Sequence, residues 1–219
     1  MRSSFVRCFA ITALAVAGSS QAAPKKTPLR LPPVERCTGD ASFDTFRAAL
    51  RKAVGNKDVG ALKAVTAPDI QIGFGGDDGW KAFAGQWGLA KDPKASDLWK
   101  EMALVLARGC AKSMDGGRVF PSNFEDLGDD LDAFEAIVAL PGAVLRAKPD
   151  AKSASVAKLD WHTAQQLEEN VPEEWVAVRL LDGRKGYIDR DDVISPLSYR
   201  LAADKKGGRW LITAFVAGD

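Results

Sequence analysis

The spacing of apolar residues in the first half of the chain is typical of helices. Phe43, Phe46, Leu50 and Val54 lie three or four positions apart, which predicts a helix capped at Ser42 and stopped at Gly55. Three more helices are predicted, from Asp58 to about Val65, from Asp77 or Asp78 through Trp87, and from Ser96 to Gly109. The stretch Ile70–Phe74 alternates like a short strand. This half is therefore predicted to be mainly helical.

The pattern changes near Phe134. From there short β-branched runs are separated by Gly, Pro or Asp every eight to twelve residues, as in a small barrel. Asp182-Gly183 predicts a tight hairpin, because this pair tolerates the positive φ angles of a type I′ turn. A second hairpin is predicted around Lys205-Lys206-Gly207-Gly208, with Trp210 at the start of its last strand. The end of the chain is therefore expected to be structured.

The first residues carry a targeting pattern. Arg2 and Arg7 precede the apolar stretch Phe9–Gly18, and small residues follow up to Ala22, which predicts a secretory signal over 1–22. The alternative is a membrane anchor, but the stretch is about half of the roughly 20 apolar residues that a span needs. A proline-rich extension over 23–36 follows. We expect a periplasmic or secreted protein with no stable membrane span after cleavage.

The net charge bears on the class of partner, and the cysteines bear on whether the chain contains a disulfide. The net charge is +1, and removal of Arg2 and Arg7 changes it to −1, so no bulk charge favours nucleic acid. Two cysteines remain after cleavage, and in an oxidising compartment Cys37 and Cys110 are expected to form a disulfide. The alternatives are two free thiols or a Cys/His nucleophile pair, but neither cysteine has a catalytic flank.

Several groups of residues could in principle carry chemistry, and each has a plainer interpretation. The single histidine, His162, excludes an H-E-x-x-H zinc site and is expected on the barrel surface. The loop Gly73–Gly79 has no Gly-Lys-Ser/Thr ending and places Asp77 and Asp78 where an anion would bind, so a strand-to-helix turn is predicted. Two acidic groups remain, Glu125, Asp126, Asp129, Asp130 and Asp132, and Glu168, Glu169, Glu173 and Glu174.

The first acidic group lacks the residue order of a calcium loop, and the second lacks a partner base. A solvated face and a polar connection around Pro172 are the favoured interpretations. We therefore expect no catalytic residues, no metal and no cofactor, and a protein that is not an enzyme.

Three segments of the second half carry a family resemblance. They are Leu145-Arg146-Ala147-Lys148-Pro149, Trp175-Val176-Ala177-Val178 and Asp182-Gly183-Arg184-Lys185-Gly186-Tyr187-Ile188. Together they resemble the bacterial SH3-like (SH3b) domain, although Val144 stands where that family has an asparagine. The match covers 134–195, about a third of the chain without its signal. The resemblance implies a small β-barrel that binds peptidoglycan peptides or partner proteins.

The whole chain is also similar to exported bacterial proteins in which a helical module precedes such a barrel. In those proteins the chain closes with a Trp-containing strand and Ala-Gly-Asp, here Trp210 and Ala217-Gly218-Asp219. This similarity implies an architecture and a compartment rather than an activity.

The predicted fold class is α+β. A mainly helical module over 37–133 is expected before an SH3-like β-barrel over 134–195 and a closing hairpin over 196–219. We expect an exported, non-enzymatic cell-envelope protein that binds a peptide, a peptidoglycan fragment or a protein partner. Its candidate binding residues are Trp161, Tyr187 and Trp175, of which Trp175 is the one more expected in the core.

A second hypothesis is a small-molecule pocket or enzyme, with a site between the helical module and the closing strands. The helical start and final Trp-containing strand are loosely similar to the nuclear-transport-factor-like fold, although the N-terminal half offers little sheet for such a fold. A deep pocket lined by Trp80, Trp87 or Trp99 would favour it. A structural pair of domains that buries those aromatics is the third alternative.

Overall fold

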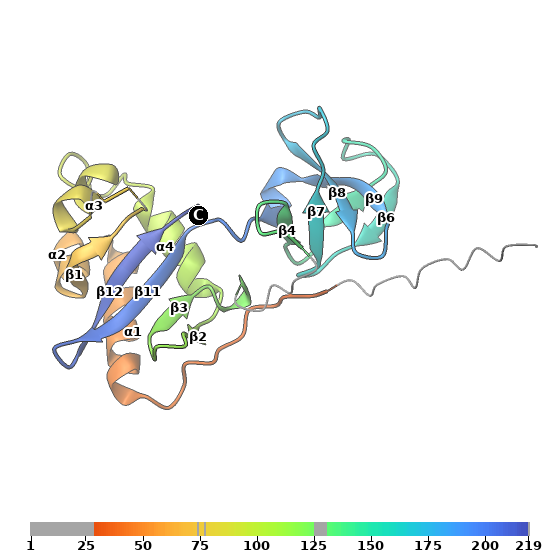
Figure 1. Cartoon of the computed structure of the whole chain (residues 1–219). Helices are drawn as coiled ribbons and strands as arrows, with labels where there is room; N and C mark the ends of the chain where they lie inside the picture. The colour runs from red at the N-terminus through yellow and green to blue at the C-terminus, as the bar shows by residue number, and fades with distance from the viewer. Residues whose placement is uncertain (1–28, 74, 77, 125–130, 219) are drawn as a thin grey trace, which may run out of the picture.

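A computed structural model describes residues 29–73, 75, 76, 78–124 and 131–218. The predicted signal, the start of the extension, Asp77 and four of the acidic residues (Glu125, Asp126, Asp129 and Asp130) lie outside this part. The described residues form two lobes, visible at left and right in Figure 1. The first lobe holds four helices and a five-stranded sheet, and the second holds a seven-stranded sheet, so the fold is α+β as predicted.

The four helices of the first lobe lie where the apolar spacing predicted them. They are α1 (Ala41–Asn56), α2 (Val59–Ala64), α3 (Trp80–Gln86) and α4 (Leu98–Ala107). Several ends differ from the prediction. Asp40 rather than Ser42 caps α1, because its carboxylate accepts hydrogen bonds from two backbone N–H groups of the first turn. The helix also passes through Gly55 and ends at Asn56, and the cap residue Lys57 that follows has a left-handed φ of 52°.

The loop before α3 explains why no aspartate caps that helix. Gly79 is the cap residue and makes no side-chain cap. The carboxylate of Asp78 instead accepts a hydrogen bond from the N–H of Ile72 at 3.1 Å, which holds the loop against the end of the preceding strand. Asp58, the predicted first residue of α2, is its cap. Asp97 takes the cap position of α4 without a side-chain hydrogen bond, and Ser96, the expected cap, accepts the N–H of Leu98 at 3.2 Å.

The sheet of the first lobe is completed by the end of the chain. Its order is β1-β12-β11-β3-β2, with β1 parallel to β12 and the other neighbours antiparallel. The strands are β1 (Thr66–Gln71), β2 (Ala111–Lys112), β3 (Arg118–Phe120), β11 (Arg200–Lys206) and β12 (Arg209–Val216). The C-terminal hairpin therefore returns to the N-terminal lobe (Figure 1), and the module that was expected to be mainly helical contains a sheet.

One face of this sheet packs against the helices. Phe43 of α1, Phe83 of α3, Phe120 of β3 and Phe215 of β12 are fully buried in a single cluster. Aromatic contacts continue across the layers, since Phe43 lies 5.1 Å from Trp210 and Phe83 lies 6.3 Å from Phe215 between ring centroids. The interior between the sheet and the helices is thus filled by side chains from both ends of the sequence.

The second lobe is an antiparallel sheet of the order β10-β4-β7-β8-β9-β5-β6. Its strands are β4 (Ala136–Ala139), β5 (Val144–Arg146), β6 (Ser155–Lys158), β7 (Thr163–Gln166), β8 (Trp175–Leu180), β9 (Lys185–Asp189) and β10 (Val193–Ile194). The 3₁₀ helix η1 (Ser122–Phe124) precedes the sheet in sequence, and a second one, η2 (Arg190–Asp192), connects β9 to β10. Within the described residues no ladder joins the edges β10 and β6, so the pairing shows an open sheet.

The β8–β9 and β11–β12 hairpins have different turn types. At the β8–β9 turn only Gly183 has positive φ, at 88°, so the predicted type I′ turn is wrong there. The N–H of Gly183 donates to Leu180 O at 2.9 Å, and the loop closes with the bond from Leu180 N–H to Arg184 O. The β11–β12 turn does have two positive φ angles, 59° at Gly207 and 80° at Gly208, as a type I′ turn requires.

The N-terminal extension connects the two lobes. The backbone of Leu31 donates to Trp161 O at 2.8 Å, and Thr163 donates to Leu29 O at 2.9 Å, beside β7. Further on, Cys37 forms the predicted disulfide with Cys110, with the Cα atoms 5.6 Å apart. The extension therefore runs along both lobes, as Figure 1 shows. In the described part of the chain, no helix has the length and apolar character that crossing a membrane requires.

Candidate functional site

Two of the three predicted binding aromatics share one face of the seven-stranded sheet. Val176, Val178 and Leu180 of β8 point into the core of the lobe, so Trp175 and Ala177 point to the opposite face. Tyr187 of β9 lies directly across from Ala177 and therefore faces the same side. The expectation that Trp175 packs in the core is wrong, since it is half-buried and lies outside the core cluster.

Charged side chains surround this aromatic pair. Arg146 of β5 lies across from Tyr187, and its Nη1 donates to Ser153 O at 2.9 Å. The hydroxyl of Tyr187 donates to Glu169 Oε2 at 3.2 Å, and this hydrogen bond raises the pKa of Tyr187. On the other side, Arg179 Nη2 donates to Gln165 Oε1 at 2.6 Å. The resulting face, called here the aromatic face, combines two rings with two arginines.

Trp161 belongs to a different environment. It precedes β7 with a φ of 55° and packs against a small buried cluster of Leu31, Val138 and Ile194. Next to it, Nδ1 of His162 accepts a hydrogen bond from Asp160 N–H at 2.9 Å, and burial together with the charge of Arg30 lowers the pKa of the imidazole. The structure therefore brings Trp175 and Tyr187 together and leaves Trp161 beside the N-terminal extension.

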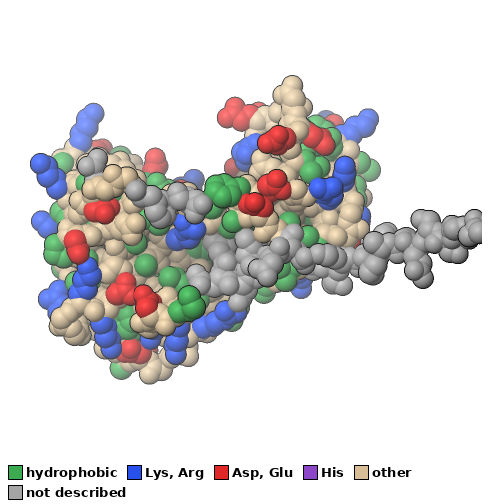
Figure 2. All heavy atoms as spheres, in the orientation of Figure 1, with side chains coloured by type: hydrophobic (Ala, Val, Ile, Leu, Met, Phe, Trp, Pro, Cys, Tyr) green, Lys and Arg blue, Asp and Glu red, His purple; other side chains and the backbone are tan. Residues whose placement is uncertain are grey.

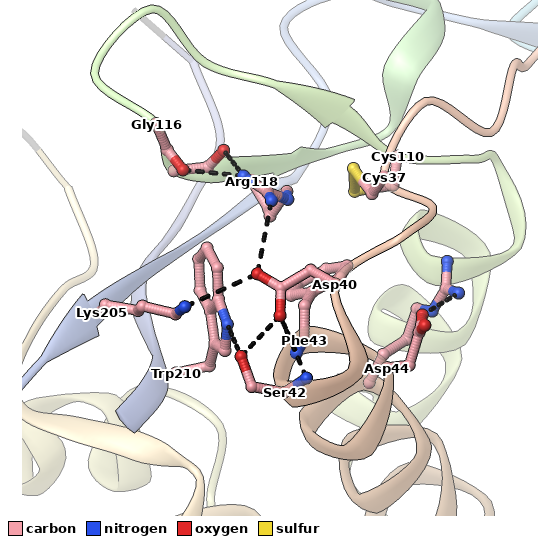
Figure 3. A network of polar contacts seen from close by, with 12 residues as sticks. Cys37, Asp40, Ser42, Phe43, Asp44, Cys110, Gly116, Arg118, Lys205 and Trp210 are labelled. Carbon is pink, nitrogen blue, oxygen red and sulfur yellow. Dashed lines mark hydrogen bonds and ion pairs between the residues drawn. A yellow bond between two sulfur atoms is a disulfide. The ribbon is translucent and has the colours of Figure 1, made fainter. Parts of the chain in front are cut away.

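A charged cluster in the first lobe was not predicted. Its centre is Arg118 of β3, whose side chain is only 9% exposed. The guanidinium lies over two neighbouring rings, 5.2 Å from the centroid of Phe43 and 4.8 Å from that of Trp210. Its Nη1 donates to the carbonyls of Gly116 and Gly117 at 2.7 and 2.9 Å (Figure 3). The carbonyl and ring contacts fix the position of a buried cation.

The carboxylate nearest to this cation is committed to the helix cap. Oδ1 of Asp40 accepts hydrogen bonds from Ser42 Oγ, Ser42 N–H and Phe43 N–H at 2.6, 3.0 and 3.1 Å. Its other oxygen, Oδ2, lies 3.8 Å from Arg118 Nη2 and 3.5 Å from Lys205 Nζ. The hydrogen bonds from Ser42 and Phe43, with help from the charge of Lys205, lower the pKa of Asp40 to about 2.

The cluster joins elements that are far apart in sequence. Asp40 precedes α1, Arg118 lies on β3, and Lys205 and Trp210 come from the C-terminal hairpin, as Figure 3 shows. The only local signal was a charged residue between glycine and apolar residues at 117–120. Nothing in that segment indicates that the end of the chain lies beside it.

The pocket expected from the second hypothesis is present only as open grooves. Trp80 lines a groove of about 530 Å³ together with Lys63 and Lys81. Trp99 is buried and donates to Pro93 O at 2.5 Å, and Trp87 packs on Phe215 with 5.7 Å between ring centroids. These three tryptophans do not converge on one deep cavity in the described residues.

The remaining predicted groups have structural roles where they are described. Asp132 accepts the N–H of Phe134 at 2.8 Å, and the four glutamates around Pro172 are exposed. Glu35, Cys37 and Cys110 have ligand atoms within 4.8 Å of one another, but the disulfide occupies both sulfurs. These residues therefore do not form a metal centre in the oxidised protein.

No family model, curated protein or solved structure matches this chain. Its function is therefore inferred from the residues and their geometry.

Proposed function

We propose that the chain is an exported, non-enzymatic cell-envelope protein that binds a peptide or a peptidoglycan fragment on the aromatic face of its second lobe. The observation that carries this proposal is the common orientation of Trp175 and Tyr187 away from the core. Half-exposed rings flanked by arginines suit a peptide, because a peptide offers apolar side chains and carboxylates at close spacing.

The same lobe is proposed to be an SH3-like domain. The block from Asp182 to Ile188 that carries the resemblance forms the β8–β9 turn and most of strand β9. The packing explains why the second glycine of this block, Gly186, has no side chain. A Cβ there would lie 2.4 Å from Arg146 O and 3.0 Å from two Leu145 carbons. The glycine thus permits the close approach of β5 and β9, and this supports the family interpretation of both segments.

The compartment is proposed to be periplasmic or extracellular. The Cys37–Cys110 disulfide supports an oxidising environment. The arginines, apolar stretch and small residues of 1–22 support export.

A pull-down with purified peptidoglycan tests the proposal. We expect retention of the wild-type protein and loss of at least about tenfold in bound fraction for the double variant W175A/Y187A, which removes both rings of the face. F134A is the control, since Phe134 is a ring that is 66% exposed but precedes the sheet. Failure of the wild-type protein to bind, or equal losses in both variants, would contradict binding at this face.

The second candidate function is a small-molecule site between the helices and the closing strands. The charged cluster favours it, because Arg118, Asp40 and Lys205 meet between the start of α1 and the C-terminal hairpin. This site and the aromatic face are in different lobes, so each can be tested without disturbing the other.

A further inference from the structure

The charged cluster of the first lobe has more positive charge than its own acid neutralises. Two cations, Arg118 and Lys205, approach one oxygen of Asp40. The carboxylate of Asp40 is ionised at neutral pH, so this group of three carries a net charge of +1. Lys206, the next residue, points away from the cluster and pairs with Asp69 at 2.6 Å. The excess charge therefore belongs to the inner side of the hairpin.

The donors of Arg118 are also only partly used. Its Nη1 serves two carbonyls, but Nε is buried and has no hydrogen-bond partner in the described structure. The distance of 3.8 Å from Nη2 to Asp40 exceeds the roughly 3.2 Å of a good hydrogen bond. Because a buried guanidinium with unused donors is costly, an acceptor that reaches Nη2 would be favoured.

The cluster opens toward solvent on the side of Lys205. The side chain of Lys205 is 47% exposed and that of Asp40 is 27% exposed, whereas Arg118 lies behind them. Both Nζ of Lys205 and the guanidinium of Arg118 lie over Trp210, at 5.1 and 4.8 Å from its ring centroid. The two cations are therefore held on the same aromatic support, with Asp40 Oδ2 between them.

A groove lies next to the cluster and contacts it through Trp210 and through Ser42, which donates to Asp40. Ser42 and Trp210 line this groove, which has a volume of about 520 Å³ and extends between α1 and the β11–β12 hairpin. Thr45 and Arg209 add further polar groups to its wall, and Ala49 and Ala64 leave it open. Its volume is within the range of small-molecule sites.

We propose that this cluster binds the oxyanion group, carboxylate or phosphate, of a small molecule whose remainder lies in the adjoining groove. The proposal rests on the second candidate function and names its ligand class. The anion accepts hydrogen bonds from Lys205 Nζ and Arg118 Nη2, and it neutralises the one positive charge that Asp40 does not. Asp40 competes with the ligand, since its Oδ2 faces the same two donors.

NMR titrations of the full-length protein with inorganic phosphate and with acetate, at fixed ionic strength, test the proposal. The reporters are the indole N–H of Trp210, which donates to Ser42 Oγ at 3.1 Å, and the Nε–H of Arg118. We expect saturable shifts of both signals. A stronger response to phosphate or to acetate distinguishes a phosphorylated from a carboxylate ligand.

Two variants, each with a matched control, distinguish a specific anion site from general charge attraction. K205A is expected to weaken binding about tenfold, whereas K206A, which removes an equal charge from the opposite side of the strand, leaves it unchanged. D40N is expected to strengthen binding about tenfold because it removes the competing charge. D44N is its control, since Asp44 pairs with Arg47 outside the cluster.

Equal effects of K205A and K206A would show general charge attraction and overturn the proposal, as would the absence of saturable shifts. Thermal melting shows whether D40N is folded, and the two lysine variants decide the matter if it is not. Peptidoglycan retention depends on Trp175 and Tyr187 of the other lobe, so a negative result here leaves the first function standing.

Discussion

At the scale of single residues, Arg118 shows how a cation is kept in an aromatic interior. Its charge is not neutralised by a close ion pair, since Asp40 Oδ2 is 3.8 Å away. Two carbonyls and two ring faces stabilise the guanidinium instead. This arrangement leaves one edge of the guanidinium for an external acceptor, which a bidentate pair with Asp40 would have occupied.

The helix cap at Asp40 leads to a prediction about how folding stability depends on pH. Its pKa is about 2 in the folded chain, below the ordinary value of 3.8, because Ser42 and Phe43 donate to the ionised form. A lowered folded-state pKa stabilises the fold fully above about pH 4, and this contribution is lost as pH falls toward 2. The stability difference between the wild type and D40N in urea unfolding should therefore be constant above about pH 5. The difference should shrink steadily down to pH 2, and a difference that grows on acidification would contradict this origin of the low pKa.

At the scale of elements, the position of Gly55 inside α1 leads to a prediction about the stability of the variant G55A. Gly55 lies inside the helix rather than at its end, and a Cβ there meets no heavy atom within 4 Å. G55A should stabilise the protein by about 0.5–1 kcal/mol, because alanine loses less backbone entropy than glycine in a helix. Chemical denaturation measures the gain. A loss of stability in G55A would mean that α1 ends before this position.

At the contact between β5 and β9, the same substitution of glycine by alanine, at Gly186, is expected to destabilise the protein. A Cβ on Gly186 would lie 2.4 Å from Arg146 O, and backbone cannot move aside as a flexible side chain can. G186A should therefore destabilise the protein by about 2 kcal/mol or more and loosen the pairing of Arg146 with Tyr187. Denaturation and amide exchange in β5 and β9 measure both effects. G142A is a control for added volume, since Gly142 has open space around it but a φ of 90°, which predicts a smaller loss of about 1 kcal/mol.

These elements also show what the sequence could predict. The helices were found because their apolar spacing is local, as in Phe43 to Val54. The cap of α1 was assigned two residues late because Asp40 and Ser42 are both good cap residues. The face of Trp175 was missed because it and the next three residues of β8, Val176 to Val178, are all apolar, so the sequence does not alternate there.

At the scale of the whole molecule, the pairing of distant segments was beyond prediction. Thr66 of β1 lies beside Ile212 of β12, and Ala202 of β11 lies beside Val119 of β3. Short segments carry no signal for such partners, since alternation identifies a strand but not its neighbour. The second lobe lies between β3 and β11 in the chain, and the charged cluster exists only because the C-terminal hairpin returns. The candidate site in the first lobe therefore could not be found before the topology was known.

The last prediction concerns the N-terminal extension and the disulfide that attaches it to the first lobe. The disulfide at Cys37 and Cys110 has a sequence separation of 73, and C37S/C110S should lose about 4 kcal/mol through the larger entropy of the unfolded chain. Arg36 N–H donates to Cys110 O at 2.8 Å close to this link, whereas Leu31 N–H donates to Trp161 O in the other lobe. Amide exchange of the double variant should therefore lose protection at Arg36 and keep it at Leu31, because the contacts with the second lobe do not need the disulfide. Equal loss at both residues would instead mean that the extension detaches from the two lobes as one unit, and that the disulfide determines its position along its whole length.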